Sequence, residues 1–380
     1  MANEPFGDIP LFRELQRILS AGEGPVNFEI ARQVANAIVQ QVPEVPAETH
    51  SFGTFAEAAR TSEMLLAGYT RRSLDEPVLA RTITRSVWVA STLEAWRWLL
   101  EHLSQRMSDQ VTTFAEDSGA EVNPMGAVMG QIAPLLLGIQ AGTLVGHLAQ
   151  ESLGRYDPLI PRNDDGRLFF VVSNVEKLSD EYSLDPEGLR KWLALQDVAR
   201  HLVLTGVDWV NRYFRSLFYE LLDSIEIDAS ELQTRLAELQ TQSPEALEEG
   251  LGIDQVIPIV PTVRHAQALD RLRAFVACVE GYAKHSSTVV ASEVVGDFEK
   301  IEEGVTRHTN ASSPGKTMLS QILGVTFDRA LEASGATFCA AVAKLHGIQA
   351  LNRVWEAPDN LPAFDEIKDP FAWIERVIEA

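Results

Sequence analysis

Residues 193–204, LALQDVARHLVL, place four polar side chains capable of chemistry in an apolar background. Gln196 and Arg200 are four residues apart, and so are Asp197 and His201. At 3.6 residues per turn, residues four apart lie on one line of a helix. The spacing therefore predicts two neighbouring polar lines, one an amide with a guanidinium and the other a carboxylate with an imidazole.

The element that must position these groups is a helix within residues 183–206, SLDPEGLRKWLALQDVARHLVLTG. Asp185 is a suitable N-cap, Pro186 fits the first turn, and Glu187 has a charge that favours the helix dipole there. Gly206 is a plausible stop. These signals predict a helix that begins just after Asp185 and ends near Gly206.

This helix is expected to be buried, because apolar residues share the line of Arg200 and form a second line beside it: Leu189, Leu193, Val203, Leu195, Val198 and Leu202. A buried guanidinium without a counter-charge costs roughly several kcal/mol. Arg200 should therefore have a carboxylate partner from elsewhere in the chain.

The stretch from HLAQESLGRYDP (147–158) through residues 166–203 resembles a bacterial zincin-like metallopeptidase family, some of whose members are labelled as associated with coenzyme F420 biosynthesis. The resemblance extends to the tryptophan-rich segment near Trp88, to VEGYAKH (279–285) and to LNRVWEAPDNLPAFDEIKDPFAWIERV (351–377). It implies a large zincin-like helical domain that covers most of the chain.

In that family a His-Glu-x-x-His helix binds zinc through its two histidines, and the glutamate activates the bound water. The matching positions here hold Gln196, Asp197 and Arg200, and Glu280 matches a family glutamate that resembles a third zinc ligand. An amide and a cation in place of two imidazoles weaken metal binding. The resemblance thus implies a degenerate site, with Asp197 at the general-base position and the family's zinc lost.

Two hypotheses follow for the polar residues. In the first, the Arg200 guanidinium lies about where the metal would be and pairs with Glu280. In the second, the ligand set has slipped by one residue to Asp197 and His201, joined by Glu280 and by His285. A slip of one residue rotates a side chain by about 100°, so the second hypothesis requires the helix itself to turn.

Two positions also have simpler interpretations. Glu280 can form an exposed ion pair with Lys284 on the next turn, which is worth only about a few tenths of a kcal/mol. In LGRYDP, Arg155 departs from the family pattern, where glutamine is usual. Tyr156 and Asp157 are expected to anchor a turn, without a catalytic role.

The rest of the sequence predicts a mainly α fold with a small β-hairpin or sheet. Helical periodicity covers residues 82–103, and residues 167–172 predict a strand. Residues 122–150 contain no Asp, Glu, Lys or Arg and are long enough to span a bilayer. Because Gln131, Gln140 and His147 interrupt them, we predict instead a central buried helix whose small residues allow close packing. QVIPIVPTV (255–263) is expected to be extended, whereas residues 241–252 and 307–316 are expected to be polar connections. We expect one domain over 1–380, with a helical part at about 1–120 packed on a core at about 121–380.

The amino-acid composition disfavours some classes of binding partner. Among the 380 residues, 32 are basic and 54 acidic, giving a net charge of −22. Nucleic acid and anionic membrane surfaces are therefore not expected as partners. The two cysteines form no disulfide framework, and the first residues do not resemble a secretory signal, so a cytoplasmic location is expected.

These observations predict a zincin-like homologue without zinc-dependent peptidase activity, acting as a binding or scaffold protein for an unknown protein, peptide or small molecule. The alternative is an active metal-dependent hydrolase that uses Asp197, His201 and Glu280. A third possibility is that the cleft persists near Gln196 as a pocket for a peptide or small ligand.

Overall fold

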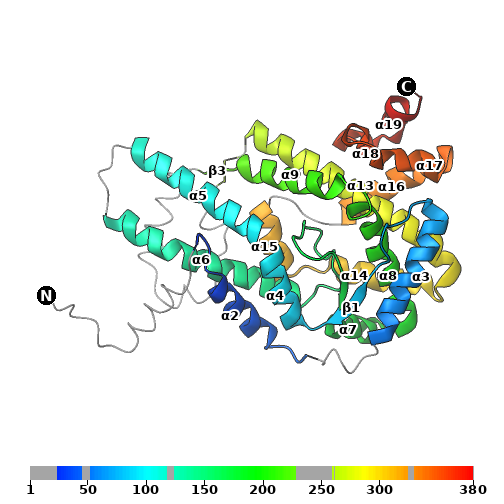
Figure 1. The fold of residues 1–380 in the computed structure, drawn as a ribbon, viewed down its shortest axis with the longest axis horizontal. Coiled ribbons are helices and arrows are strands. Elements are labelled where there is room, and N and C mark those ends of the chain that lie inside the picture. The colour runs from blue at the N-terminus through cyan, green and yellow to red at the C-terminus, as the bar shows by residue number, and fades with distance from the viewer. Residues whose placement is uncertain are drawn as a thin grey trace.

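A computed structural model describes residues 24–44, 52–117, 124–227, 259–260, 262–323 and 329–379. Helices form most of these residues, and two short strand pairs complete them (Figure 1). The prediction of a mainly α fold with a small sheet is confirmed. The expected connection at residues 241–252 lies outside the described residues, and the division of the chain into domains stays a prediction.

The first half of the chain contributes α2 (Phe28–Val39), α3 (Phe52–Thr70), β1 (Ala80–Ile83), α4 (Arg85–Ala95), α5 (Arg97–Asp117), α6 (Pro124–Ala149), β2 (Leu168–Val171), α7 (Val172–Tyr182), α8 (Pro186–Leu204), α9 (Val210–Asp223) and β3 (Glu226–Ile227). The second half contributes β4 (Ile259–Val260), α13 (Val263–Val294), α14 (Phe298–Asn310), α15 (Pro314–Leu323), α16 (Arg329–His346), α17 (Ile348–Leu351), α18 (Phe364–Lys368) and α19 (Pro370–Ile374). Short 3₁₀ turns at Asn352–Trp355 and Pro358–Asn360 and a π turn at Glu375–Glu379 complete the tail.

The predicted strand at 167–172 is confirmed as β2, which pairs in parallel with β1. The prediction of one continuous helix over 82–103 was wrong at the start of this range and in its middle. Thr82 pairs with Phe170 in the sheet, and the Thr84 hydroxyl then accepts from the Val87 amide at 3.3 Å and caps α4. The helix breaks at Trp96, between α4 and α5. β-Branched residues before a capping threonine favour a strand that the helical periodicity concealed.

The extended segment expected at 255–263 is described from Ile259, and it pairs as β4 with β3 at Ile259–Val260. It is not extended to its end, because the Thr262 hydroxyl accepts from the His265 amide at 3.1 Å and starts α13. The connection expected at 307–316 is also shorter than predicted. Residues 307–310 end α14, and Pro314 already begins α15.

The central helix predicted at 122–150 corresponds to α6, whose glycines let α2 approach closely. A Cβ on Gly142 would lie 2.4 Å from the carbonyl oxygen of Ala31, and one on Gly146 would lie 3.0 Å from the Cα of Ala35. The helix is buried on this side, whereas Leu136 and Ile139 remain partly exposed. Among the described residues, no helix is both long and apolar enough to cross a membrane.

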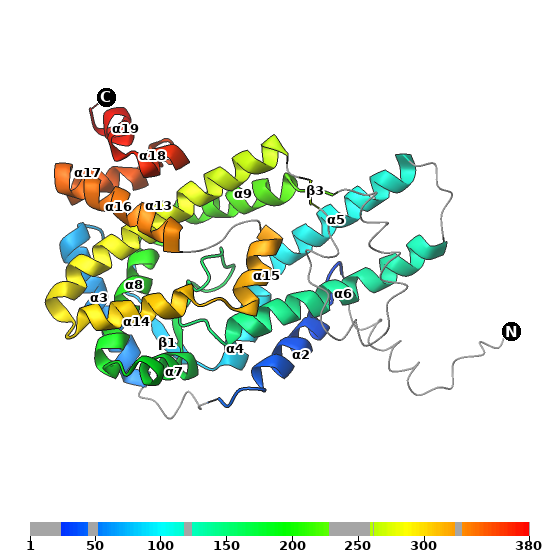
Figure 2. The ribbon, with the colours of Figure 1, turned by 180° about the vertical axis from the view of Figure 1, so that it is seen from behind.

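The helix that carries the polar residues, α8, begins as predicted. The Asp185 carboxylate accepts from the Gly188 amide at 2.7 Å, and Pro186 occupies the first turn. Leu189, Trp192 and Val198 on α8 are fully buried, and α3 and α13 pack against this helix. Figure 2 shows α8, α13, α14 and α16 gathered in one end of the molecule. The predicted burial of α8 is therefore confirmed.

Glu280 is fixed by the crossing of α13 with α16. Glycines meet at this crossing, since a Cβ on Gly281 would lie 2.1 Å from the carbonyl carbon of Gly335, and one on Gly335 would lie 1.8 Å from the Ala277 oxygen. Backbone contact this close leaves the neighbouring Glu280 little freedom to shift.

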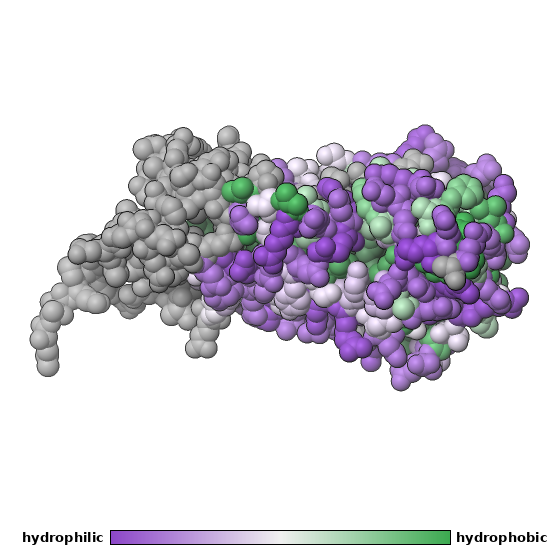
Figure 3. All heavy atoms as spheres, turned by 90° about the horizontal axis from the view of Figure 1, so that it is seen from above, coloured by the Kyte–Doolittle hydropathy of each residue, from purple (hydrophilic) through white to green (hydrophobic). Residues whose placement is uncertain are grey.

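On the face of the molecule shown in Figure 3, hydrophilic residues predominate and apolar ones form small separate patches.

We expect Gly335→Ala to lower the free energy of unfolding by about 2–4 kcal/mol, because the new methyl group must push α16 away from α13. Urea unfolding followed by circular dichroism measures this. Gly68→Ala in α3 is the matched control, since nothing lies within 4 Å of the added carbon and alanine favours a helix. Equal midpoints for wild type and Gly335→Ala would contradict the close crossing.

Candidate functional site

Arg200 and Glu280 form a buried ion pair between α8 and α13. The Arg200 Nη2 donates to Glu280 Oε2 at 2.7 Å, and Nε donates to both carboxylate oxygens, at 3.0 and 3.2 Å. Both side chains are 14% exposed. The pairing hypothesised for these two residues is therefore present. Lys284 does not compete for Glu280, because it pairs with Glu302 at 2.8 Å instead.

Asp197 adds a second carboxylate to the same guanidinium. Its Oδ1 accepts from Arg200 Nη1 at 3.3 Å, and its Oδ2 accepts from the backbone amide of Arg155 at 3.0 Å. The turn reaches Asp197 only because residue 154 is glycine, where a Cβ would lie 2.4 Å from Asp197 Oδ2. Gln196 makes a longer contact, accepting from Arg200 Nη2 at 3.4 Å.

Burial and charge oppose one another in this cluster. Burial raises the pKa of Asp197 to about 6, with Asp157 and Glu280 contributing repulsion, although Arg200 and the Arg155 amide act the other way. Burial also raises the pKa of Glu280 despite the attraction of Arg200. The pKa of Arg200 would fall with burial, but Glu280 and Asp197 outweigh this and raise it. The guanidinium is thus a permanent cation, and the pKa of Asp197 is shifted toward neutral pH.

A cavity of about 150 Å³ opens on this cluster. Gln196, Asp197, Arg200 and Glu280 all line it, so the four predicted positions reach one space. Its other walls come from residues 148–159, from α14 and α15, and from Leu331 and Glu332 on α16. The cleft considered from sequence near Gln196 is therefore present as a pocket.

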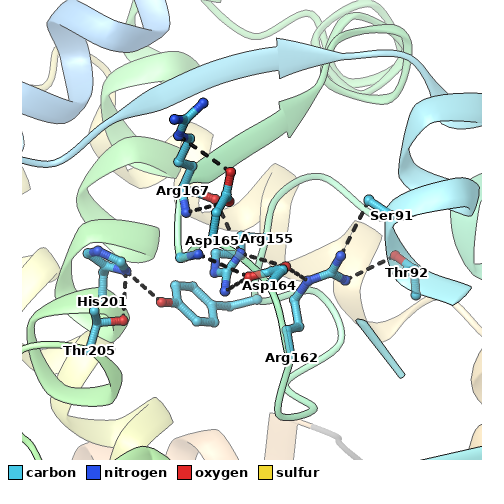
Figure 4. Close-up of polar contacts among 11 residues, drawn as sticks. Ser91, Thr92, Arg155, Arg162, Asp164, Asp165, Arg167, His201 and Thr205 are labelled. Carbon is cyan, nitrogen blue, oxygen red and sulfur yellow. Dashed lines mark hydrogen bonds and ion pairs between the residues drawn. The ribbon is translucent and has the colours of Figure 1, made fainter. Parts of the chain in front are cut away.

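The structure does not bring His201 and His285 into the same cluster. His201 Nδ1 lies 2.7 Å from the Tyr156 hydroxyl and 3.2 Å from that of Thr205, and burial lowers its pKa to about 4 (Figure 4). His285 Nε2 lies 2.7 Å from the Tyr69 hydroxyl. Neither ring lines the cavity. Within the described ranges, no group of three or more His, Cys, Asp or Glu side chains is arranged to hold a metal ion.

The turn at residues 153–158, which faces α8, is anchored by a network of charged side chains. Asp164 accepts from Arg155 at 2.6 Å and from Arg162 at 2.8 Å, and Arg162 also donates to the Thr92 hydroxyl at 3.0 Å (Figure 4). Arg155 occupies the position where the resembled family has glutamine. Its side chain therefore ties the turn to residues 164–167, while its amide binds Asp197.

Tyr156 and Asp157 stabilise this turn, as expected. Asp157 Oδ2 accepts from the Leu153 amide at 2.9 Å, and the Tyr156 hydroxyl joins the turn to α8 through His201. Sequence reasoning missed that Asp157 also lines the cavity, together with Glu151, Lys316 and Glu332. A usable signal for Asp157 and Glu151 was their place within LGRYDP and two residues before it. No sequence pattern connects Lys316 or Glu332 to α8.

Comparison with known proteins agrees with this architecture. Residues 26–374 match a family described as zincin-like metallopeptidase. A crystal structure from Chloroflexus aurantiacus, described as a putative hydrolase with a novel fold, is 24% identical and has a TM-score of 0.67. The match covers 92% of this chain and 98% of that chain, and it shows a shared fold. A comparison with curated proteins found no match.

The family match over this fold therefore defines a zincin-like protein. More specifically, since the family match spans most of its length, the chain belongs to the zincin-like metallopeptidase family. The resemblance noted from sequence is confirmed.

We expect Glu280→Gln to lower the free energy of unfolding by about 3 kcal/mol, because it leaves the Arg200 charge buried with Asp197 alone. Urea unfolding of wild type, Glu280→Gln, Arg200→Met and the double variant gives the coupling energy of the pair. A coupling of about 2 kcal/mol or more is expected.

The matched control is the exposed pair of Arg271 with Glu220, whose side chains are 51% and 48% exposed. Glu220→Gln should change stability by less than about 0.5 kcal/mol. If Glu280→Gln were as mild as Glu220→Gln, the pair would not carry the structural role described here.

The lowered pKa of Asp164 predicts that the protein loses stability in acid. Although burial opposes it, Arg155 and Arg162 hold the pKa of Asp164 at about 2, below the ordinary 3.8. A depressed pKa contributes stability above about pH 4, which is lost as the pH falls toward 2. After allowance for solvent screening, we expect a contribution of roughly 1–2 kcal/mol.

Asp164→Asn should therefore flatten the stability profile between pH 4 and 2 and lower stability at neutral pH, because two buried arginines lose their shared counter-charge. Urea unfolding across this pH range measures both effects. Asp165→Asn, at an exposed neighbour that pairs with Arg167, is the control and should retain the wild-type profile. An Asp164→Asn profile that still falls with wild-type slope would refute the assignment.

Proposed function

We propose that this protein is a zincin-like homologue that has exchanged zinc-dependent peptidase chemistry for a binding role. The observation that carries the proposal is the Arg200–Glu280 ion pair, which occupies the positions matched to two metal ligands of the family. The chain has the fold of its family. The ion pair at the matched ligand positions supports the proposal that this fold binds a ligand and does not cleave peptides.

The residues present do not fit a zinc ion. A guanidinium has no lone pair to offer a metal, and Arg200 places a full positive charge between the other candidates. Both carboxylate oxygens of Glu280 already accept hydrogen bonds from this guanidinium. Gln196 offers only an amide oxygen, which binds zinc less well than imidazole does. No catalytic step through a metal is derived from this arrangement.

Asp197 is poorly placed to replace the metal chemistry. With a pKa of about 6 it could exchange a proton near neutral pH. Its two oxygens, however, accept from Arg200 and from the Arg155 amide. A carboxylate engaged on both oxygens holds the turn and the helix together, and it activates a water molecule less readily than a free carboxylate does.

The alternative of a rebuilt metal site receives less support. It requires His201 to join Asp197 and Glu280, but His201 faces Tyr156 and Thr205. His285 faces Tyr69. The alternative therefore needs a rotation of α8 that would break the Arg200–Glu280 ion pair.

The proposal extends to partners and location. A net charge of −22 favours a neutral or basic partner surface and disfavours nucleic acid and anionic membranes. Both cysteines, Cys278 and Cys339, are free and buried, which suits a reducing cytoplasm. The cavity volume favours a small molecule or the end of a peptide over a protein domain.

Protein purified without chelators is expected to contain much less than one zinc ion per chain, measured by elemental analysis. Replacing the two altered positions, Gln196→His with Arg200→His, should create zinc affinity because Glu280 is then free to act as the third ligand. Adding Asp197→Glu restores the family pattern completely.

The matched control carries Glu280→Gln in the same two-histidine background and should lose most of the gained affinity. Circular dichroism checks that each variant folds. One zinc per chain in the wild type, removed by Glu280→Gln, would falsify the proposed loss of the metal. A folded two-histidine variant without zinc affinity would count against the inferred geometry of the site.

A further inference from the structure

The cavity at α8 has an excess of negative charge. Three cationic side chains line it, Arg200, Lys284 and Lys316, against five carboxylates: Glu151, Asp157, Asp197, Glu280 and Glu332. Each cation is already engaged. Arg200 binds Glu280 and Asp197, Lys284 binds Glu302 and Glu332, and Lys316 lies 3.6 Å from Glu151 and donates to backbone carbonyls at 2.9–3.3 Å. An anionic ligand would therefore find no available cation.

Asp157 is the carboxylate with spare capacity. Its Oδ2 accepts from the Leu153 amide, whereas no described residue donates to its Oδ1. It is only partly buried, and its charge raises the pKa of Glu151, Asp197 and Glu280 after the larger effect of burial on each. Asp157 thus acts on three other carboxylates of the same cavity. A cation placed beside Asp157 would relieve repulsion among all four groups.

Gln196 supplies a second, independent feature. It is 9% exposed and lines the cavity, and its Oε1 accepts the long contact from Arg200. Within the described part of the chain, its Nε2 donates to no acceptor. Nε2 is not among the side-chain atoms that are both fully buried and unpartnered, so it is accessible from the cavity that Gln196 lines. A ligand atom in the cavity can therefore accept a hydrogen bond from Nε2.

Building on the binding role proposed above, we propose that the cavity binds a small primary amine with a hydrogen-bond acceptor next to its ammonium group. The ammonium binds Asp157, and the acceptor, a carbonyl oxygen, binds Gln196 Nε2. An amino-acid amide and the amino terminus of a short peptide share this chemistry. The volume of about 150 Å³ fits a group of this size.

The geometry explains why the neighbouring carboxylates are less suitable. Asp197 and Glu280 are held by Arg200, and Glu151 accepts from the Ser313 hydroxyl at 2.6 Å. These three carry their charge into the cavity but have partners already. Among the described residues, Asp157 is the one of the five that makes no ion pair, since Glu151 lies 3.6 Å from Lys316 and Glu332 lies 3.7 Å from Lys284.

Isothermal titration calorimetry of the full-length protein at about pH 7 tests the proposal with alaninamide and with the peptide amide Ala-Ala-Ala-NH₂ as separate probes. Both carry a largely protonated amine at this pH. Binding of either probe supports the inference, and the comparison distinguishes a free amide from a peptide terminus. Their N-acetylated forms keep the carbonyl but lose the charge, and they should bind at least about tenfold more weakly.

Asp157→Asn should weaken binding by about tenfold or more, because asparagine can still accept from the Leu153 amide but has no charge. Gln196→Leu should weaken the binding of alaninamide without affecting the binding of methylamine, which has no hydrogen-bond acceptor. Asp165→Asn, on the exposed side of the turn, is the matched control and should bind as the wild type does.

The inference is overturned if neither probe binds, if the acetylated forms bind equally, or if folded Asp157→Asn binds as tightly as wild type. This outcome leaves the proposed loss of zinc chemistry standing, because that depends on metal content and on the two-histidine variant. Conversely, stoichiometric zinc with intact amine binding would reject the proposed function but retain the amine site.

Discussion

The buried guanidinium of Arg200 is the interaction on which the site depends. It lies on a helix that is apolar on most sides, so its charge must be neutralised by neighbouring elements. Glu280 does this from α13, and Asp197 adds a second contact from the same turn of α8. Glu280 is in turn held by the glycine crossing of α13 with α16. One charge thus links the position of three helices to the shape of the cavity.

The sequence predicted the parts of this arrangement that rest on local rules. The Asp185 cap, Pro186 in the first turn and the apolar lines of α8 all follow from residue type and spacing, and the structure confirms each. The need for a carboxylate beside Arg200 follows from burial alone. The identity of that carboxylate does not, because Glu280 is 80 residues away. The resemblance to the zincin-like family supplied it.

Other features could not be predicted because they depend on tertiary contacts. Thr82 lies in a stretch with helical periodicity, but it forms a strand because β2 is available to pair with it. The cavity walls from α14, α15 and α16 combine residues with no common pattern in sequence. Gly154 was not singled out, although its missing Cβ is what brings the Arg155 amide to Asp197. Such close approaches are visible only once two segments are placed in space.

Charge connects the altered positions to the ligand inferred for the cavity. In a zincin-type site, a dipositive ion with two neutral imidazoles, one carboxylate ligand and one carboxylate base is balanced overall. In this chain the matched positions hold one guanidinium with Asp197 and Glu280, which leaves one negative charge in excess. Asp157 increases the excess on the adjacent wall, where Glu151 is paired with Lys316. A cluster with a surplus of negative charge in a partly closed cavity favours a cation, and Gln196 restricts which cation by requiring an acceptor beside it. On the proposed assignment of these positions, their side chains create the electrostatic conditions for an ammonium group.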